Sequence, residues 1–352
     1  MASSSNSAFL RACRSEKGDS TSHVPVWFMR QAGRSLPEYR EIRGSGSILD
    51  AIKNPELSAE ITLQPVRRYG VDAAILYSDI VVPVAAIGFG VDVAPGIGPV
   101  VEQPFERASD LDRLRPLEAE IDTDYVIETV KILAAELPVP LIGFAGAPFT
   151  VASYLIEGRP SRTYAKTKAL MHSEPGVWHA LMEKLTDLAS ASLRSQIENG
   201  AQALQVFDSW AGALNLPDYQ NYVMPHTRRL FESVADLGVP GIHFGVGTGE
   251  LLTAMAEVGA DVVGVDWRVP LDVARQRVPA RCALQGNLDP ALCLAPWDVV
   301  DNAVRDVLQR NNGHPGHIFN LGHGVLPETN PDILKKVVEL VHEIGRCDGE
   351  KN

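Results

Sequence analysis

The chain has 352 residues, of which 45% are hydrophobic and 22% charged, a profile typical of a globular protein. That length accommodates two average domains or one large α/β barrel. Its 32 Lys and Arg against 44 Asp and Glu give a net charge of −12, which excludes a globally basic surface for nucleic acid or anionic membranes. Any anionic ligand must therefore bind to a local cluster of cations.

The two ends of the chain are expected to be tails. Residues 1–21 are rich in Ser and charged residues and lack the apolar block of a secretory signal, so we predict a flexible tail there and a second one at 347–352. The four cysteines show no C-x-x-C pair and no zinc or disulfide spacing, which favours a reducing, cytoplasmic setting. No apolar run reaches the roughly 18 residues that span a bilayer, so no membrane partner is expected.

Short apolar runs recur between stretches of helical periodicity, a pattern typical of parallel strands covered on both faces. We expect eight strands: Pro25–Met29, Ala73–Tyr77, Leu141–Ala145, Ala203–Phe207, Gly241–Phe244, Val262–Val265, Cys282–Gln285 and His317–Leu321. No Pro/Gly/Ser-rich linker divides the chain into two folding units. These features predict an α/β fold, a single (β/α)8 TIM barrel, over residues 22–346.

The segments between the strands have readable boundaries. Apolar stripes at helical spacing predict helices over 126–137 and 178–197. Pro225 interrupts a third stripe, which predicts two shorter helices or a kink. Residues 91–104 carry a P-G-I-G-P turn between Val-rich runs and predict a hairpin inserted after the second strand.

Polar residues directly after barrel strands face the end of the barrel where barrel enzymes place their sites. These residues are Arg30, Arg34, Ser78, Asp79, Thr150, Tyr154, Asp208, Ser209, His243, Asp266, Asn287, Asn320 and His323. The set contains two arginines, few acids, no Cys nucleophile and no Lys. Arg30 and Arg34 stand four apart around Gly33, which predicts either a fork for carboxylates or a solvated helix start paired with Glu38 and Glu41.

Two segments are densest in such residues, PVWFMRQAGRSLPEYR (25–40) and GFAGAPFTVASYLIEG (143–158). Both closely resemble the signature segments of the uroporphyrinogen decarboxylase family. The resemblance covers about residues 23–342 in order and spacing, and includes YSDI (77–80), FDSWAG (207–212), QGNLDP (285–290) and NLGHGV (320–325).

The resemblance implies a cofactor-free barrel, usually a homodimer, that removes the four acetate carboxyl groups of uroporphyrinogen III to give coproporphyrinogen III in haem biosynthesis. The family's substrate-binding residues correspond here to Arg30, Gln31, Ala32, Gly33, Arg34, Asp79, Tyr154, Ser209 and His323. Among them, Asp79, Arg30, Tyr154 and His323 are the expected catalytic residues. Ser35 replaces the family's common Tyr, and Trp210 stands where animal members commonly have His, which affects the expected shape of the pocket.

The substrate's chemistry agrees with this residue set. Eight carboxylates around four pyrrole N–H groups require cations at the edge of a site and an acceptor at its centre, which suits Arg30, Arg34 and Asp79. Protonation of a pyrrole carbon makes the ring its own electron sink, so neither a metal nor pyridoxal phosphate is expected. Asp79 would stabilise the resulting cation. The plainer alternative for Asp79 is an ordinary buried carboxylate or helix cap.

Three other functions are weighed from the sequence. The GVGTGE segment (245–250) follows a strand and has Asp266 further on, as in a dinucleotide fingerprint, but its third glycine is misplaced. His243 raises a zinc-dependent corrinoid methyltransferase of the same barrel superfamily, although Gly245 stands where that family has a Cys ligand. The third is a non-catalytic barrel that binds a tetrapyrrole.

Overall fold

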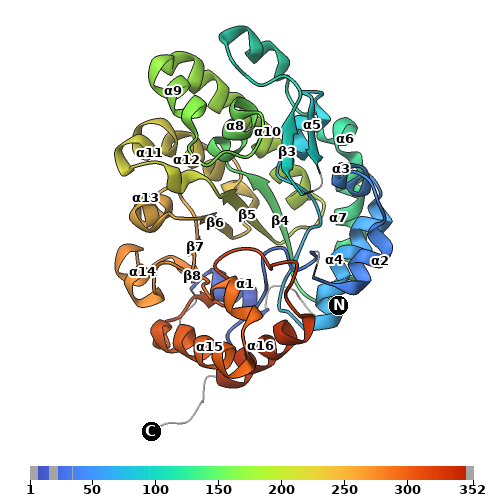
Figure 1. Cartoon of the computed structure of the whole chain (residues 1–352), viewed down its shortest axis with the longest axis vertical. Helices are drawn as coiled ribbons and strands as arrows, with labels where there is room; N and C mark the ends of the chain where they lie inside the picture. The colour runs from blue at the N-terminus through green and yellow to red at the C-terminus, as the bar shows by residue number, and fades with distance from the viewer. Residues whose placement is uncertain (1–6, 16–22, 34, 95, 346–352) are drawn as a thin grey trace.

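The computed structural model describes residues 7–15, 23–33, 35–94 and 96–345 (Figure 1). In this part of the chain seven parallel strands form one curled sheet in the order β1-β4-β5-β6-β7-β8-β9. Its strands are β1 (Ala74–Ile75), β4 (Leu141–Gly146), β5 (Ala203–Asp208), β6 (Gly241–Gly245), β7 (Val262–Gly264), β8 (Ala283–Gln285) and β9 (His317–Ile318). We call the carboxyl-terminal ends of these strands the mouth and their amino-terminal ends the foot.

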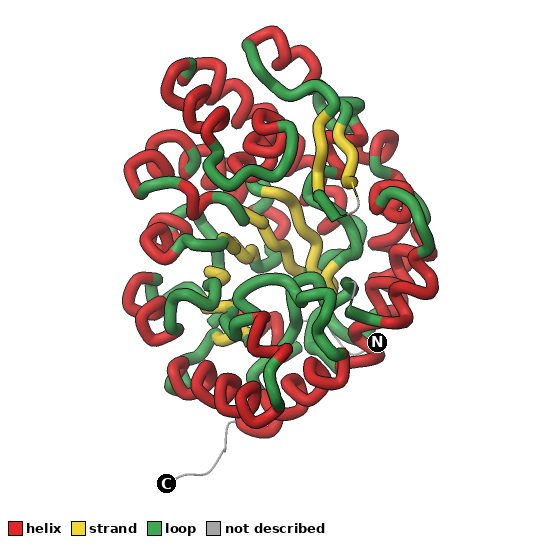
Figure 2. The backbone as a smooth tube through the Cα atoms, in the orientation of Figure 1, coloured by secondary structure: helices red, strands yellow, loops and turns green. Residues whose placement is uncertain are grey.

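Helices form an outer layer around the strands (Figure 2). In chain order they are α1 (Ala8–Cys13), α2 (Pro37–Arg43), α3 (Ile48–Ile52), α4 (Pro55–Tyr69), α5 (Val82–Ala86), α6 (Ala119–Asp122), α7 (Asp124–Glu136), α8 (Pro148–Glu157), α9 (Ala165–Ser173), α10 (Pro175–Glu198), α11 (Leu216–Tyr222), α12 (Met224–Glu232), α13 (Leu252–Ala256), α14 (Leu271–Arg277), α15 (Trp297–Asn311) and α16 (Pro331–Ile344). None of the described helices is both long enough and apolar enough to cross a membrane.

Several sequence-based predictions agree with these bounds. Strands β4, β5 and β6 each lie within one residue of the expected limits, and α7 and α10 occupy the two expected helical stretches. Pro225 stands in the first turn of α12, so the interrupted stripe forms two helices, α11 and α12. Proline is tolerated there because the first N–H groups of a helix have no intrahelical partner.

The segment 25–27 lies between the two edges of the sheet. At one edge the Phe319 N–H donates to the Pro25 carbonyl at 2.8 Å. At the other edge the Asp72 N–H donates to the Val26 carbonyl, also at 2.8 Å. The segment therefore links the chain just after β9 to the chain just before β1.

The prediction of a regular strand at Pro25–Met29 is nevertheless wrong, because this segment forms only one isolated bridge, from Val26 to Phe319. Side chains replace the usual strand partners. The Val26 N–H donates to the Asp72 carboxylate at 2.7 Å, and the Met29 N–H donates to the amide oxygen of Asn320 at 3.1 Å.

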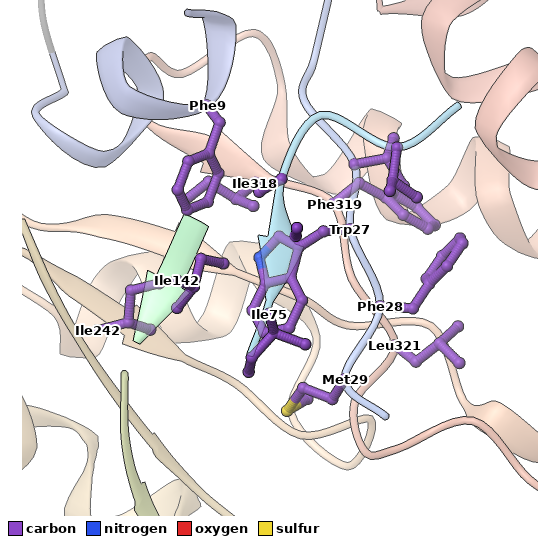
Figure 3. Packing of buried hydrophobic residues seen from close by; sticks show 14 of the residues in the cluster. Phe9, Trp27, Phe28, Met29, Ile75, Ile142, Ile242, Ile318, Phe319 and Leu321 are labelled. Carbon is purple, nitrogen blue, oxygen red and sulfur yellow. The ribbon is translucent and has the colours of Figure 1, made fainter. Parts of the chain in front are cut away.

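The prediction of a flexible tail at 1–21 is wrong for its described part, residues 7–15. Ser7 caps α1 by accepting a hydrogen bond from the Leu10 N–H at 3.1 Å. Phe9 is fully buried, and it projects from α1 toward the strands (Figure 3). Burial of this apolar helix face explains why the segment is ordered. The other residues of the two expected tails, 1–6, 16–21 and 347–352, lie outside the described part of the chain.

A hydrogen-bonded chain of polar groups crosses the concave interior of the curled sheet. The Trp27 indole N–H donates to the side-chain oxygen of Gln285 at 2.9 Å, and the Gln285 amide donates to Gln205 at 3.0 Å. All three residues are buried, with Trp27 packed among the apolar side chains of the core (Figure 3). The interior is therefore a packed core, and a substrate must bind above it.

Strands β2 (Val91–Ala94) and β3 (Gly98–Val101) pair antiparallel, with Val91 opposite Val101. They lie between β1 and β4 in the chain. The Val101 N–H donates to the carbonyl of Gly158, the cap of α8, at 2.9 Å. This bond places the two-stranded sheet beside α8.

Candidate active site

A tight turn after the 25–27 segment presents Arg30. Its φ of 59° lies in the left-handed region, which costs a non-glycine residue about 1 kcal/mol. Such backbone outliers concentrate at functional sites. A Cβ on Gly33 would approach the Arg30 carbonyl oxygen to 2.5 Å, so the turn requires glycine there. A Cβ on Gly324 would meet the Arg30 Cδ at 2.5 Å, so the arginine stem lies directly on the loop after β9.

Gln31 and its neighbours hold this turn. The Gln31 amide oxygen accepts from the Phe28 N–H at 3.0 Å, and its amide nitrogen donates to the Ala73 carbonyl at 3.1 Å. The side chain is fully buried and bonded to backbone, so the structure gives Gln31 a positioning contact rather than a place in the open mouth. Ala32 is buried beside it, while Arg34 lies outside the described residues.

Asp79 lies four residues beyond the end of β1, just before α5. Its Oδ1 accepts from the Val81 N–H at 3.0 Å, and the carboxylate is partly exposed. Burial raises the pKa of Asp79, and the nearby Arg30 guanidinium opposes that rise only in part. A carboxylate in such surroundings is stabilised by any further hydrogen-bond donor that a ligand brings.

Tyr154, on α8, faces the same space. Burial raises the pKa of its hydroxyl, with a further rise from the charge of Asp79, and Arg30 acts in the opposite direction. Its ring lies 3.8 Å, centroid to centroid, from that of Trp210, which in turn lies 5.0 Å from Tyr164. The phenol therefore stays protonated at neutral pH and is available as a donor near the carboxylate.

The end of β5 fixes Trp210. The Thr150 hydroxyl donates to Asp208 Oδ1 at 3.0 Å and accepts from the Trp210 N–H at 3.3 Å. Ser209, between them in the chain, is partly exposed at the strand end. Trp210 therefore lies between Tyr154 and Tyr164 with its ring tilted against both.

His323 follows β9, and its ring lies beside the aromatic rings of Phe244 and Trp267. Its Nδ1 accepts from the Gly324 N–H at 2.6 Å, so the neutral ring carries its proton on Nε2. Burial, and after it the charge of Arg30, lower the pKa of His323 to about 4. The ring centroid lies 6.4 Å from that of Phe244, edge to face. At neutral pH His323 is therefore an uncharged hydrogen-bond donor.

A second cation at the mouth was missed from the sequence. Arg268 follows β7, and its guanidinium lies 4.0 Å above the Trp267 ring and 2.7 Å from Asp266 Oδ2. A Cβ on Gly322 would meet the Trp267 nitrogen at 2.3 Å, so this loop packs on the loop that carries His323. The signal was present as the first basic residue after β7, but only the acidic residue at the strand end was considered.

His243 and Asp208 do not belong to the mouth. His243 Nδ1 bonds to the Met255 carbonyl of α13 at 3.2 Å, and its ring lies 5.6 Å from that of Phe231 on α12. Its Nε2 lies 3.5 Å from Asp208 Oδ2, and both side chains are fully buried. Because His243 faces the helical layer, it is not placed to hold a metal at the mouth.

The GVGTGE segment likewise has a structural explanation. The Gly247 N–H and the Arg268 N–H both donate to the Asp266 carboxylate. This carboxylate therefore holds two loops together instead of facing a ribose.

A hollow of about 270 Å³ lies at the foot, lined in part by Leu204 and Asp261. Barrel enzymes place their chemistry at the opposite end.

The mouth thus combines a carboxylate, a strained arginine and two neutral donors. Arg30 influences the pKa of Asp79, Tyr154 and His323, so the four expected catalytic residues lie close together. They come from four separate segments of the chain. Such a set can hold an anionic ligand at its edge while accepting N–H groups at its centre.

Comparisons with known proteins give the family. The uroporphyrinogen decarboxylase (URO-D) family model matches residues 4–344. A uroporphyrinogen decarboxylase of Salinispora tropica is 62% identical over 96% of this chain and 91% of its own length, and one of Streptomyces avermitilis is 58% identical over 96% and 94%. A methyltransferase from Methanosarcina mazei shares the fold, with a TM-score of 0.74 at 20% identity over 96% of this chain and 98% of its own. The sequence relationship covers both expected signature segments, and the chain belongs to the uroporphyrinogen decarboxylase family of carboxy-lyases.

Proposed function

We propose that the chain removes the four acetate carboxyl groups of uroporphyrinogen III as CO2 and releases coproporphyrinogen III. The observation that carries this proposal is the placement of Asp79 beside Arg30 and Tyr154 at the mouth, with a pKa that burial raises. Pyrrole N–H groups are donors of the kind that this carboxylate lacks. The family membership supplies the substrate class.

In the proposed mechanism Asp79 stabilises positive charge on the reacting pyrrole. Protonation of a ring carbon turns the pyrrole into an electron sink. The bond between the acetate methylene and the carboxyl carbon then breaks, its electron pair moves into the ring, and CO2 leaves. The methylene carbon gains a proton from solvent and the ring carbon loses the one it gained, so a methyl group forms. The fixed negative charge of Asp79 favours the cationic stage without covalent catalysis.

The remaining residues orient the carboxylates. Arg30 pairs with the reacting acetate or a neighbouring carboxylate, and its aliphatic stem packs against Gly324 in the loop after β9. Tyr154 and His323 donate hydrogen bonds in their neutral forms, as their pKa shifts require. Ser209 is the expected donor at the end of β5. Arg34 is expected to be a second cation at the edge.

Product analysis tests this function directly. Purified protein is incubated with uroporphyrinogen III, and the products are separated by their number of carboxyl groups from eight to four. We expect the four-carboxylate product to accumulate, and its formation should survive dialysis against a chelator. Binding without any loss of carboxyl groups would instead identify a non-catalytic tetrapyrrole-binding barrel.

Three further features are inferred with this function. Hydrogen bonds from the 25–27 segment to both sheet edges support closure of the sheet into a full (β/α)8 barrel, with β2 and β3 as a hairpin insertion. The family resemblance supports a homodimer, which light scattering would measure. Among the described cysteines, Cys13, Cys282 and Cys293 are free and buried, which supports a reducing, cytoplasmic location.

A further inference from the structure

Three side chains converge at the foot, far along the chain from one another. His23 precedes the 25–27 segment, Asp72 precedes β1, and His342 lies on α16. His23 Nε2 lies 2.7 Å from Asp72 Oδ1, and His342 Nε2 lies 2.8 Å from Asp72 Oδ2. The two imidazole rings are 4.2 Å apart, centroid to centroid. One potential ligand atom from each residue lies within 4.8 Å of the others.

The carboxylate at the centre of this cluster is fixed by backbone. Asp72 Oδ2 accepts from the Val26 N–H at 2.7 Å, and the Asp72 N–H donates to the Val26 carbonyl. The reciprocal bonds hold the aspartate in one orientation, so its lone pairs point at both imidazoles. The site is therefore assembled before any ion arrives, which lowers the entropic cost of binding.

The cluster is open to water on one side. The side chains of His23, Asp72 and His342 are 24%, 15% and 27% exposed. An ion can therefore enter from solvent and keep a water molecule as its fourth ligand. Full burial would have prevented both.

We propose that His23, Asp72 and His342 bind one divalent transition-metal ion, with zinc as the best match. Two imidazole nitrogens and one carboxylate oxygen suit zinc, cobalt or nickel, whereas calcium and magnesium prefer sets made only of oxygen. Tetrahedral zinc with bonds of about 2.0–2.1 Å separates its ligand atoms by about 3.3 Å. His23 and His342 lie 2.7 and 2.8 Å from different oxygens of Asp72, and the three ligand atoms lie within 4.8 Å of one another, so a bound ion would displace the two hydrogen bonds and bring both imidazoles to it.

The position of the site indicates what the ion does. It lies before β1, whereas Asp79 lies after it, so the ion is at the opposite end of the strands from the mouth. It would join α16 to the segment that links the two sheet edges. The ion would therefore stabilise the fold at this seam and take no part in the decarboxylation proposed at the mouth.

Cobalt titration of the metal-free full-length protein tests the proposal. We expect one site per chain, with the visible absorption bands of tetrahedral cobalt, and displacement of cobalt by zinc. His342→Ala should weaken binding by at least about tenfold, since even residues that only support a ligand contribute that much. Zinc should raise the melting temperature of the wild type and not that of the variant.

Two further variants keep the test decisive. His342→Gln retains an N–H that can bond Asp72, so it should fold normally while still losing tight metal binding. His179→Ala removes the other close histidine pair, in which His179 Nδ1 lies 2.9 Å from His226 Nε2. Retention of the cobalt bands in both His342 variants, or their loss in His179→Ala alone, would overturn the proposal. Absence of binding in the wild type would show a purely hydrogen-bonded cluster.

Discussion

Asp72 and Asp79 flank the same short strand, β1, yet their surroundings are opposite. Asp72 lies at the foot and accepts hydrogen bonds from Val26, His23 and His342. Burial alone would raise its pKa, but these donors lower it overall. Its carboxylate therefore has three partners from the protein itself, two of which belong to the proposed metal site.

Asp79 lies at the mouth, and its donors from the protein are backbone N–H groups of the next two residues, Ile80 and Val81. Burial raises its pKa, and Arg30 is close enough to oppose the rise without cancelling it. Within the described part of the chain Arg30 forms no ion pair, so its charge is also available. A ligand that brings N–H donors to Asp79 and a carboxylate to Arg30 would therefore satisfy both groups.

The difference teaches that residue type alone does not separate a structural from a functional carboxylate. What separates them is how many donors the fold itself supplies. Perturbation of a pKa by burial together with a specific charge partner, in an open position, is the physical mark of a functional group. Asp79 has this mark, whereas the donors around Asp72 lower its pKa and suit it to a role in stabilising the fold.

Exchange of each aspartate for asparagine should produce the largest contrast. Asp79→Asn removes the negative charge and keeps the shape, so the first decarboxylation should slow by about 10²- to 10³-fold while substrate binding is largely retained. Asp79→Glu should be intermediate, because its charge is kept but displaced. Single-turnover loss of one carboxyl group measures the rate, with folding checked by circular dichroism.

Asp72→Asn is the matched control. It should leave turnover near that of the wild type and lower the free energy of unfolding by about 1–3 kcal/mol, because charged hydrogen bonds to two histidines are lost. Equal rates for Asp79→Asn and the wild type would reduce Asp79 to a positioning residue. Slow turnover in a well-folded Asp72→Asn protein would remove the distinction between the two ends of β1.

The two arginines at the mouth extend the comparison. Arg30→Ala should weaken substrate binding by about 2–5 kcal/mol, because a desolvated ligand carboxylate loses its partner. Arg268→Ala should change it by less than about 1 kcal/mol, since that guanidinium is already paired with Asp266, whereas Arg30 has no such partner among the described residues. Titration with substrate measures both affinities. Arg34→Ala is expected to weaken substrate binding about as much as Arg30→Ala. If all three variants lost only a little substrate affinity, these arginines would belong to the solvated surface and not to the binding site.

The sequence predicted the fold best where apolar runs decide the structure. Strands β4, β5 and β6 are buried on both faces, so their runs have sharp ends that propensity alone can locate. The segment 25–29 shows the same composition but is held by the side chains of Asp72 and Asn320. Asp72 and Asn320 are far from this segment in the sequence. The local pattern of apolar residues therefore could not show that segment 25–29 forms a loop bonded to these side chains instead of a regular strand.

The candidate site was predicted unevenly for the same reason. Asp79 and His323 follow strands, so position in the sequence predicts their place at the mouth, and their roles remain a prediction. Gln31 was expected at the substrate, but its amide bonds to Phe28 and Ala73 across the fold, contacts that only three-dimensional packing creates. Arg268 was missed because its stacking on the neighbouring tryptophan depends on a loop conformation.

Gly324→Ala tests whether the position of Arg30 matters as well as its charge. The new Cβ would lie 2.5 Å from the Arg30 Cδ and 2.8 Å from its Cγ. Because a flexible side chain can move away, stability should change little, while displacement of the guanidinium should lower kcat/KM by about tenfold. In an Arg30→Ala background the same substitution should have no further effect.

Gly176→Ala is the control for that experiment, since a Cβ there would meet nothing within 4 Å. It lies on α10, where alanine is the better helix former, so activity should be unchanged. Additive losses from Gly324→Ala and Arg30→Ala would mean that the glycine acts on something other than this arginine.

The smallest expected effect is a pH dependence of stability that originates at His323. Its pKa in the folded protein is about 4, against about 6.5 for an ordinary histidine. As the pH falls below about 6.5 the unfolded chain binds a proton at this residue and the folded protein does not, so the free energy of unfolding declines until the pH reaches the folded pKa. His323→Asn removes this contribution, and the stability of the variant should therefore decline less steeply between about pH 6.5 and pH 4.

Burial also lowers the pKa of His226 and His317 to about 4, but both histidines are present in the two proteins and cancel in the difference. Denaturant unfolding at a series of pH values measures the slopes, and His172→Asn, at an exposed histidine, controls for the loss of an imidazole elsewhere. Parallel slopes for His323→Asn and the wild type would mean that folding does not lower the pKa of His323, so that the mouth would hold a charged imidazolium below about pH 6.5 instead of a neutral donor.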